Sequence, residues 1–328
     1  MQEPVLEKLS GAAFLAFPQM DGMLLDELKE RYGFCKNPAA VYGDLLYFPD
    51  FKVEQFSGTF GFPYWAKCVM ENPTIMHFDS IGSCSGVLRS IQRKWAPYRF
   101  TLFRRAELIQ EKLSYINLKP RKFPTDIPKS PIGLWTLIDS NTAIFSEKTN
   151  SFLPAGTLCF EEDHVNPPSR AYLKLQESLT LANLFNGTKL PSNGTRCFEA
   201  GASPGGWTWV LTQLGASVYA VDRSPLSPEL MNNPLVKFAA HDAFTLSPKE
   251  VGMCGWVFSD VICYPERLYE WCCRWLESGL TKNMICTIKM QGKTDWKIIK
   301  NFQDIPGSRI VHLNYNKHEL TWIHTETE

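Results

Sequence analysis

The sequence predicts an α/β fold whose C-terminal half is a mostly parallel, doubly wound sheet, and three observations indicate it. A short apolar run at 196–199 leads into a glycine-rich turn and then into a helical pattern at 205–214. A second apolar run at 217–221 follows and ends in Asp222. Towards the C-terminus, further strand-like runs alternate with helical spacing. Strands that alternate with helices are typical of a parallel sheet with helices on both faces.

The length of the chain suggests two domains. A chain of 328 residues is long for a single domain. We expect an N-terminal α/β domain at 1–158 and a second domain at 159–328, with a proline-rich connection at 166–168. No apolar run reaches the roughly 20 residues that a membrane helix needs, so we expect no membrane partner.

The ten cysteines and six histidines form no recognisable metal site. No two cysteines have the C-x-x-C spacing and no signal peptide is recognisable, so we expect reduced thiols and a cytoplasmic location. His312, His318 and His324 recur every six residues and could share one face, but no carboxylate pattern completes a ligand set. We therefore expect no bound metal.

The N-terminal domain is expected to combine short strands with helices. Its apolar runs predict strands at 12–17, 41–48, 64–77, 132–138 and 142–146, and its helical spacing predicts helices at 23–32 and 86–95. Gly33 follows the first helix as a C-cap, and residues 139–141 supply the turn of a hairpin. The part up to residue 49 shows no catalytic constellation.

A basic segment at 89–129 stands out in a chain whose formal net charge is zero. Only the acids Glu107, Glu111 and Asp126 oppose its basic residues, which leaves a local excess of eight positive charges. The eleven basic residues are Arg89, Arg93, Lys94, Arg99, Arg104, Arg105, Lys112, Lys119, Arg121, Lys122 and Lys129. The interleaved aromatic residues are Trp95, Tyr98, Phe100, Phe103 and Tyr115. Basic groups neutralise phosphates and aromatic rings stack on bases, so we favour RNA contact over a solvated helix face with the rings in the core.

The second domain is expected to alternate strands and helices. Strands are predicted at 196–199, 217–221, 235–239, 255–259, 284–288, 309–313 and 320–324, and helices at 205–214 and 266–279. The second of these helices has apolar residues at the full i, i+3, i+4, i+7, i+8 spacing, which indicates a core-facing stripe.

Charged residues follow the predicted strands at the edge where a doubly wound sheet binds its ligands. Asp222 ends the second strand, Asp242 follows the third, and Asp260 ends the fourth. Lys289 ends the fifth strand and is expected to face the same crevice as Asp260. These two could form a structural salt bridge, or the lysine could take a proton from a substrate hydroxyl.

The glycine-rich turn lacks the G-x-G-x-x-G pattern of dinucleotide-binding proteins. Instead, Glu199-x-Gly201-x-x-Pro204-Gly205-Gly206 resembles the S-adenosylmethionine (SAM) turn of class I methyltransferases. The run from Gly201 through Trp207 is similar to FtsJ-type ribose 2′-O-methyltransferases in particular. This resemblance implies the class I SAM-methyltransferase fold, a Rossmann-like, mostly parallel seven-stranded sheet with an antiparallel closing hairpin.

The same resemblance implies SAM as the cofactor, lying over residues 203–207 with its ribose on Asp222 and its adenine near Asp242. The implied cofactor-binding residues are Glu199, Gly201, Ser203, Pro204, Gly205, Gly206, Trp207, Asp222, Asp242 and Asp260.

FtsJ-type enzymes also carry a Lys-Asp-Lys-Glu tetrad, and this sequence resembles them at each position. The first lysine matches Lys174 in Ser169-Arg-Ala-Tyr-Leu-Lys174, and the glutamate matches Glu319 near the C-terminus. Asp260 and Lys289 match the middle pair. The resemblance implies in-line methyl transfer to a ribose 2′-hydroxyl, with Lys289 as general base, Asp260 holding it, and Lys174 and Glu319 aligning the ribose.

Residues 150–328 look most like the bacterial large-subunit (23S) ribosomal RNA 2′-O-methyltransferase M family. Members carry an N-terminal RNA-binding part with a THUMP domain, which 89–129 matches loosely, and the region after Lys289 is compressed. The implied partner is large-subunit ribosomal RNA, bound through a basic N-terminal patch. The alternatives are a cap or transfer-RNA 2′-O-methyltransferase, a non-catalytic RNA-binding protein with a SAM fold, and an NAD-dependent oxidoreductase, which the missing dinucleotide pattern disfavours.

Overall fold

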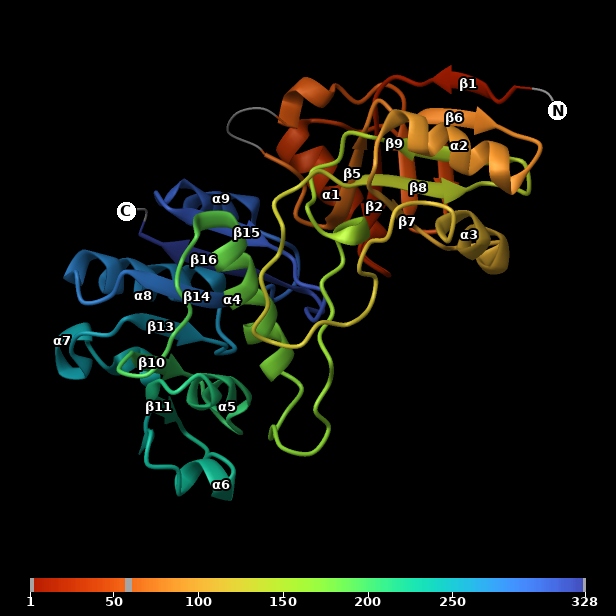
Figure 1. Ribbon diagram of the computed structural model, residues 1–328. Coiled ribbons are helices and arrows are strands. Elements are labelled where there is room, and N and C mark those ends of the chain that lie inside the picture. Colours follow the sequence, from red (N-terminus) through yellow and green to blue (C-terminus); the bar gives the residue numbers. More distant parts are fainter. Residues whose placement is uncertain (1–2, 57–60, 327–328) are drawn as a thin grey trace. The chain divides into compact units, whose positions relative to one another are not determined.

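A computed structural model describes residues 3–56 and 61–326 of the chain, which divide into two compact units (Figure 1). The first unit comprises the residues up to Pro120 together with Ile127–Leu158, and the second comprises Arg121–Asp126 and the residues from Cys159 onward. Arg121 joins the second unit through backbone hydrogen bonds with Cys159 and Glu161. The ten cysteines lie in the described ranges as free thiols. None of the described helices is long and apolar enough to cross a membrane.

The first unit contains two sheets and three α-helices in its described residues. The five-stranded sheet runs in the order β1 (Val5–Lys8), β6 (Thr74–His77), β9 (Thr142–Ser146), β8 (Gly133–Leu137), β7 (Trp95–Pro97). The four-stranded sheet runs β3 (Ala40–Tyr42), β4 (Leu45–Phe48), β2 (Ala12–Ala16), β5 (Ala66–Glu71). The helices are α1 (Asp21–Tyr32), α2 (Ile81–Ile91) and α3 (Phe103–Gln110), with 3₁₀ turns η1 (Val53–Phe56) and η2 (Pro154–Gly156).

Local turn residues explain where the first unit differs from the sequence prediction. The single strand expected at 41–48 is a hairpin, because Gly43 adopts a φ of +63° between β3 and β4. The strand expected at 64–77 is likewise divided near Asn72, whose φ is +45°. Helix α2 begins earlier than expected because Ser80 caps it by accepting a hydrogen bond from the N–H of Ser83.

The core of the first unit takes in part of the basic segment. Trp95 is fully buried, and its indole N–H donates to the carbonyl of Leu88 at 2.7 Å. It packs in one cluster with Trp135 of the sheet and Ile109 of α3. Trp95 is therefore a core residue, because its large apolar ring contributes more by burial than it could on a solvated face.

The second unit is built on one seven-stranded sheet in the part of the chain that the structure describes. The strand order is β12 (Val236–Ala240), β11 (Ser217–Asp222), β10 (Arg196–Ala200), β13 (Trp256–Ser259), β14 (Asn283–Lys289), β16 (Glu319–Thr325), β15 (Ser308–Val311). Strands β10 to β14 pair in parallel, and β16 runs antiparallel to β14 and β15. This topology confirms the expected class I methyltransferase fold, whereas the likeness of the first unit to a THUMP domain stays a prediction.

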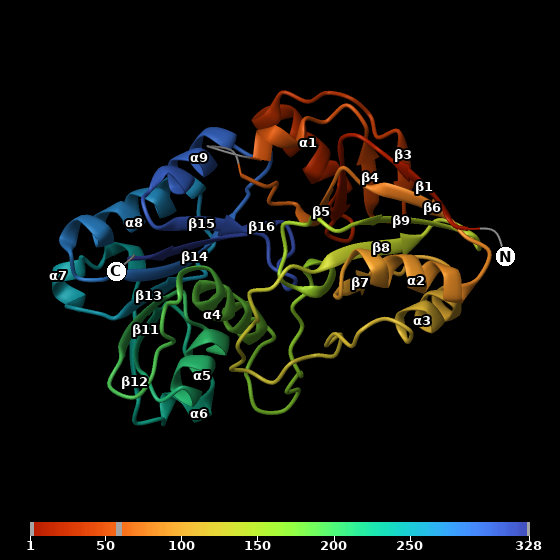
Figure 2. The same ribbon diagram turned by 45° about the horizontal axis from the view of Figure 1, so that its top comes forward.

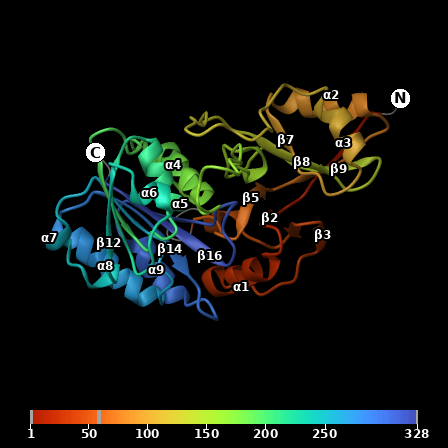
Figure 3. The same cartoon turned by 90° about the horizontal axis from the view of Figure 1, so that it is seen from below.

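Helices cover both faces of this sheet, as Figures 2 and 3 show. One face carries α4 (Tyr172–Asn186), α5 (Gly206–Gln213) and the short α6 (Pro228–Met231). The other carries α8 (Pro265–Ser278) and α9 (Trp296–Asp304), and the short α7 (Pro248–Val251) and the 3₁₀ turn η3 (Ala243–Thr245) lie in the connections. The predicted stripe of α8 is core as expected, with Trp271 and Trp275 buried against Phe198 of β10.

Candidate active site

The glycine-rich turn joins β10 to α5 and is packed tightly by protein. Gly201 and Gly205 have φ values of +75° and +112°, in the region that disfavours side chains. A Cβ on Gly201 would lie 2.6 Å from Val261 Cγ2, and a Cβ on Gly206 would lie 2.5 Å from Ser169 Oγ. These glycines therefore let two other segments approach the turn: the residues after β13 and the residues before α4.

Trp207 and Glu199, both predicted to bind the cofactor, are buried inside the second unit. The indole N–H of Trp207 donates to the carbonyl of Ala171 at 2.9 Å, which ties α5 to the start of α4. Glu199 accepts a hydrogen bond of 2.6 Å from the hydroxyl of Thr208. The contacts of both side chains in the structure are to protein, and Ser203 and Pro204 are the more open part of the turn.

Asp222, at the end of β11, holds the turn through its carboxylate. Its two oxygens accept the backbone N–H groups of Ser203 at 3.1 Å and Ser224 at 2.9 Å. A carboxylate has about four acceptor positions, so Asp222 keeps capacity for ligand hydroxyls.

Asp242 follows β12 and is surrounded by donors. Its carboxylate accepts from the N–H of Phe244 at 3.1 Å, from Arg223 at 2.8 Å and from Arg267 at 3.4 Å. Partial burial pushes the pKa of this carboxyl upward, but the Phe244 N–H and the two guanidinium groups outweigh it and hold the pKa below its usual value.

Three carboxyl groups converge beside the turn. Burial raises the pKa of Glu199 to about 8, the Thr208 hydroxyl opposes that rise, and the nearby charges of Asp260 and Asp222 add to it. Their mutual repulsion means that these acids share one small region at the carboxyl ends of β10, β11 and β13. Such a region suits a cationic ligand.

The structure brings the four residues of the predicted tetrad together. Lys174, in the first turn of α4, forms an ion pair with Glu319 at the start of β16. Lys289 Nζ, at the end of β14, lies 3.0 Å from Asp260 Oδ1. Lys289 and Glu319 are directly opposite each other in the β14–β16 register. The two ion pairs therefore form one continuous row of alternating charge at this edge of the sheet.

Asp260 keeps an acceptor position inside this row. Lys289 donates its hydrogen bond to the backbone carbonyl of Asp260 at 2.6 Å, although Oδ1 is also close. Among the described residues, Oδ1 is buried and accepts no well-oriented hydrogen bond. A carboxylate oxygen has two lone pairs, so Oδ1 can lie beside the Lys289 ammonium and still accept a hydrogen bond from a bound molecule.

Glu177 positions the helix that carries Lys174, a role that the sequence did not indicate. It lies one turn after Lys174 on α4, is buried, and accepts from both the N–H (3.0 Å) and the side-chain amide (2.7 Å) of Asn314. These bonds connect α4 to the segment between β15 and β16, which leads into Glu319. A lone buried acid gives no periodic signal, so only its partner in space reveals it.

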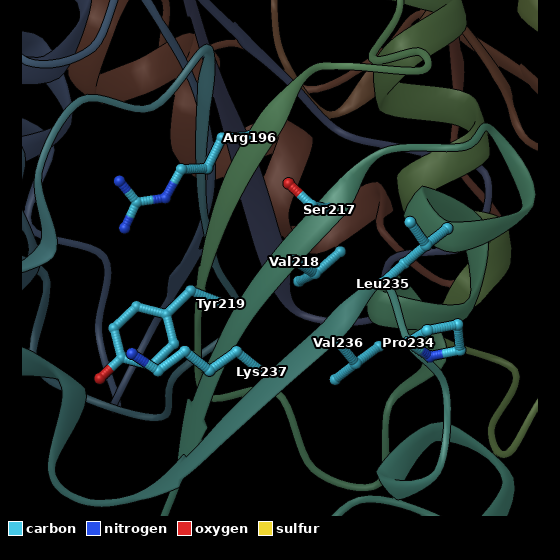
Figure 4. A pocket seen from close by; sticks show the side chains of 8 residues that line it. All are labelled: Arg196, Ser217, Val218, Tyr219, Pro234, Leu235, Val236 and Lys237. Atoms are coloured by element: carbon cyan, nitrogen blue, oxygen red, sulfur yellow. The ribbon is translucent and has the colours of Figure 1, made fainter.

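A shallow pocket lies at the opposite edge of the sheet, near the amino ends of the strands (Figure 4). Lys237 reaches over the ring of Tyr219 there, with Nζ 4.9 Å from the ring centroid. The pocket is lined by Arg196, Ser217, Val218, Tyr219, Pro234, Leu235, Val236 and Lys237. None of the predicted site residues belongs to it, so this pocket is separate from the candidate active site.

The evenly spaced histidines have separate environments. His312 is buried and hydrogen-bonded to the carbonyl of Lys317, and burial lowers its pKa to about 4. His318 is exposed, whereas His324 is buried with its ring stacked on Trp322. Two of the three are therefore buried and one is exposed. Within residues 3–56 and 61–326, no group of three or more His, Cys, Asp or Glu side chains is placed to hold a metal ion.

The basic segment is divided between the two units. Arg121 and Lys122 belong to the second unit, and the other nine basic residues belong to the first. Most of the eleven basic side chains are exposed, but Lys94, Arg105 and Arg121 are half-buried. Of the interleaved rings, Phe103 is 61% and Tyr115 is 82% exposed, so two of the five remain open for stacking.

Residues 167–291 match the FtsJ-like methyltransferase family. The chain is also similar to two proteins named Ribosomal RNA large subunit methyltransferase M. One, from Xylella fastidiosa, is 35% identical over 130 residues, which is 39% of this chain and 36% of that protein. The other, from Halorhodospira halophila, is 32% identical over 162 residues, which is 48% of this chain and 46% of that protein. The matches thus span less than half the length of these relatives.

Solved structures show weaker likeness. A putative ribosomal RNA methyltransferase from Plasmodium falciparum has 13% identity and a TM-score of 0.33, covering 48% of this chain and 97% of that chain. Fibrillarin from Aeropyrum pernix, solved with natively bound S-adenosyl-L-methionine, has 20% identity and a TM-score of 0.32, covering 47% and 75%. The family match and the strand order of the second unit make residues 167–291 similar to FtsJ-like methyltransferase domains.

Proposed function

We propose that this chain is a SAM-dependent RNA methyltransferase that modifies the ribose 2′-hydroxyl of large-subunit ribosomal RNA. The observation that carries the proposal is the row Lys174–Glu319 and Lys289–Asp260, next to a SAM-type turn at the same edge of the sheet. The relatives named for large-subunit ribosomal RNA favour that substrate over a cap or a transfer RNA.

The converging carboxyl groups fit the proposed cofactor. SAM supplies a methyl group on a sulfonium, an electrophile that needs no further activation. Ser203 and Pro204 offer the open part of the turn, and Asp222 keeps acceptor positions for ribose hydroxyls. Asp242, which already accepts from the N–H of Phe244, would accept from the amino group of the adenine. Asp260 adds negative charge opposite the positive centres of the cofactor, whereas burial raises the pKa of Glu199 to about 8 and keeps this carboxyl mostly protonated near pH 7.

The tetrad would hold the acceptor hydroxyl and take its proton. In its neutral amine form, Lys289 would take the proton of the 2′-hydroxyl as the oxygen bonds to the methyl carbon and the bond from that carbon to the sulfonium sulfur breaks. Asp260 keeps Lys289 in place through its carbonyl and carboxylate. Lys174 and Glu319 align the ribose, and most of the rate gain comes from this proximity and orientation. The scheme needs no metal.

The proposal extends to the rest of the chain. Residues 1–158 would contribute RNA contact through the exposed basic side chains of 89–129, and residues 159–328 would carry the chemistry. A cytoplasmic location, where thiols stay reduced, belongs to the same proposal.

The test is methyl transfer from labelled SAM to unmodified large-subunit ribosomal RNA. We expect label in that RNA, recovered after digestion as a 2′-O-methyl nucleoside. Lys289→Ala should abolish transfer and leave the SAM dissociation constant nearly unchanged, because Lys289 contacts the acceptor. Lys249→Ala, at an exposed lysine of α7, is the matched control. Turnover that persists in Lys289→Ala would remove the assigned role, and label in capped or transfer RNA alone would change the substrate.

A further inference from the structure

The segment between β13 and α8 presents two apolar side chains beside the tetrad. Ile262 is 78% exposed and Tyr264 is 65% exposed, only two and four residues after Asp260. Exposed apolar residues occur singly on most protein surfaces, but two on one short loop next to a charged site call for a binding role.

Every second residue of this loop is packed against the rest of the protein. Val261 packs on Gly201, where a Cβ would lie 3.2 Å from its Cα, and Cys263 is buried at 8% exposure. Pro265 is buried at the first position of α8. The backbone N–H of Asp260 is also bonded to the carbonyl of Ala200 at 3.3 Å. Because alternate residues are fixed in the protein, Ile262 and Tyr264 are held outward on a supported backbone.

We propose that Tyr264, with Ile262 beside it, forms the platform on which the base of the target nucleotide stacks. This inference rests on the proposed function. A ribose whose 2′-hydroxyl lies at Lys289 carries its base on the adjacent carbon, so the base must lie next to the tetrad. Single-stranded RNA is recognised mainly by stacking of splayed bases on aromatic rings.

The chemistry of the loop favours a base over other occupants. The tetrad already supplies the charged and hydrogen-bonding groups that a ribose requires, whereas it offers no flat apolar surface. Tyr264 supplies that surface at the same edge of the sheet. Stacking on a phenol ring tolerates any base, so Tyr264 holds the nucleotide in place without selecting its identity.

The experiment compares Tyr264→Ala, Tyr264→Phe and Met253→Ala in the full chain. Met253 is 70% exposed and precedes β13 at the opposite edge of the sheet, so it is a matched control for loss of an exposed apolar side chain. With unmodified large-subunit ribosomal RNA, Tyr264→Ala should lower kcat/KM for RNA by about tenfold, as expected for one stacked base. Tyr264→Phe keeps the ring and should remain within about twofold of the wild type. Met253→Ala should match the wild type.

Two binding measurements separate the possible outcomes. Filter binding of the same RNA should show weaker affinity for Tyr264→Ala, and calorimetry should show its SAM affinity unchanged. An active wild type with an equally active Tyr264→Ala would overturn the platform and leave the proposed function standing. Loss of SAM affinity in that variant would assign Tyr264 to the cofactor and also overturn it. A wild type that binds SAM but methylates no RNA would remove the proposed function, and the platform with it.

Discussion

In the proposed scheme, different residues at the edge of the second unit bind the cofactor and carry the chemistry. Asp222 bonds the backbone of the turn and is proposed to accept ribose hydroxyls of SAM. Asp222→Ala should therefore weaken SAM binding by about tenfold or more, since a hydrogen bond to a charged group contributes roughly 1.5–3 kcal/mol. Calorimetry with SAM measures this, and Asp304→Ala, at an exposed acid of α9, is the control. An unchanged dissociation constant would withdraw the assignment.

The buried carboxyl of Glu199 should make the stability of the folded protein depend on pH. Its folded pKa of about 8 lies above its ordinary value of 4.5, so the folded state holds a proton that the unfolded state has lost between these values. Its contribution to the free energy of unfolding is complete below about pH 4.5 and is lost as pH rises through about 8.

The neutral variant Glu199→Gln should escape that loss. The melting temperature of the variant minus that of the wild type should be clearly larger at about pH 8.5 than at about pH 5.5. The reason is that only the wild type has a carboxyl at this position whose ionisation destabilises the folded state as pH rises. The glutamine can still accept from Thr208, which limits other changes. Thermal unfolding at both pH values measures the difference, and an equal difference at both would show that another group titrates.

At the scale of elements, the strand order and the ends of the strands could be predicted because apolar runs and terminal charges are local features. Asp222, Asp260 and Lys289 stand at strand ends as the sequence indicated. Helix α4 was not predicted, since most of its residues are buried and no polar stripe marks its period. Helix α9 was not predicted either, although its cap, Asp295, and the apolar spacing after it mark it in the sequence.

The sequence does not show which charged residues of the site lie next to each other. Its resemblance to FtsJ-type enzymes indicated the four residues of the tetrad, but only the β14–β16 register places Lys289 opposite Glu319. The same holds for Trp95, whose basic neighbours favoured a surface role until the packing against Trp135 placed it in the core. Burial depends on elements distant in the sequence, and local composition does not encode it.

Glu177 connects helix α4 to the segment before β16, and its removal should disturb both elements. Glu177→Ala leaves the N–H and amide of Asn314 without their acceptor and loosens the segment leading to Glu319. We expect a loss of about 1–3 kcal/mol in stability and a fall in kcat that exceeds any change in the KM for SAM. Glu177→Gln keeps one acceptor oxygen and should recover part of kcat. A kcat that follows the fraction of folded protein in both variants would reduce Glu177 to a structural residue.

For the whole molecule, we propose that basic side chains of the first unit bind the RNA and that the second unit carries out methyl transfer. Neutralising Arg89, Arg93 and Lys112 to glutamine removes exposed charges of the basic segment without touching the tetrad. RNA affinity should fall, and the slope of log affinity against log salt should flatten by roughly 0.7 for each lost phosphate contact with single-stranded RNA. Filter binding at several salt concentrations measures both. The same change at Lys8, Lys29 and Lys52, also exposed in the first unit, should have a smaller effect, because net charge alone acts weakly at a distance. If both triple variants lose affinity equally, general electrostatic attraction accounts for binding and the basic segment is no specific contact.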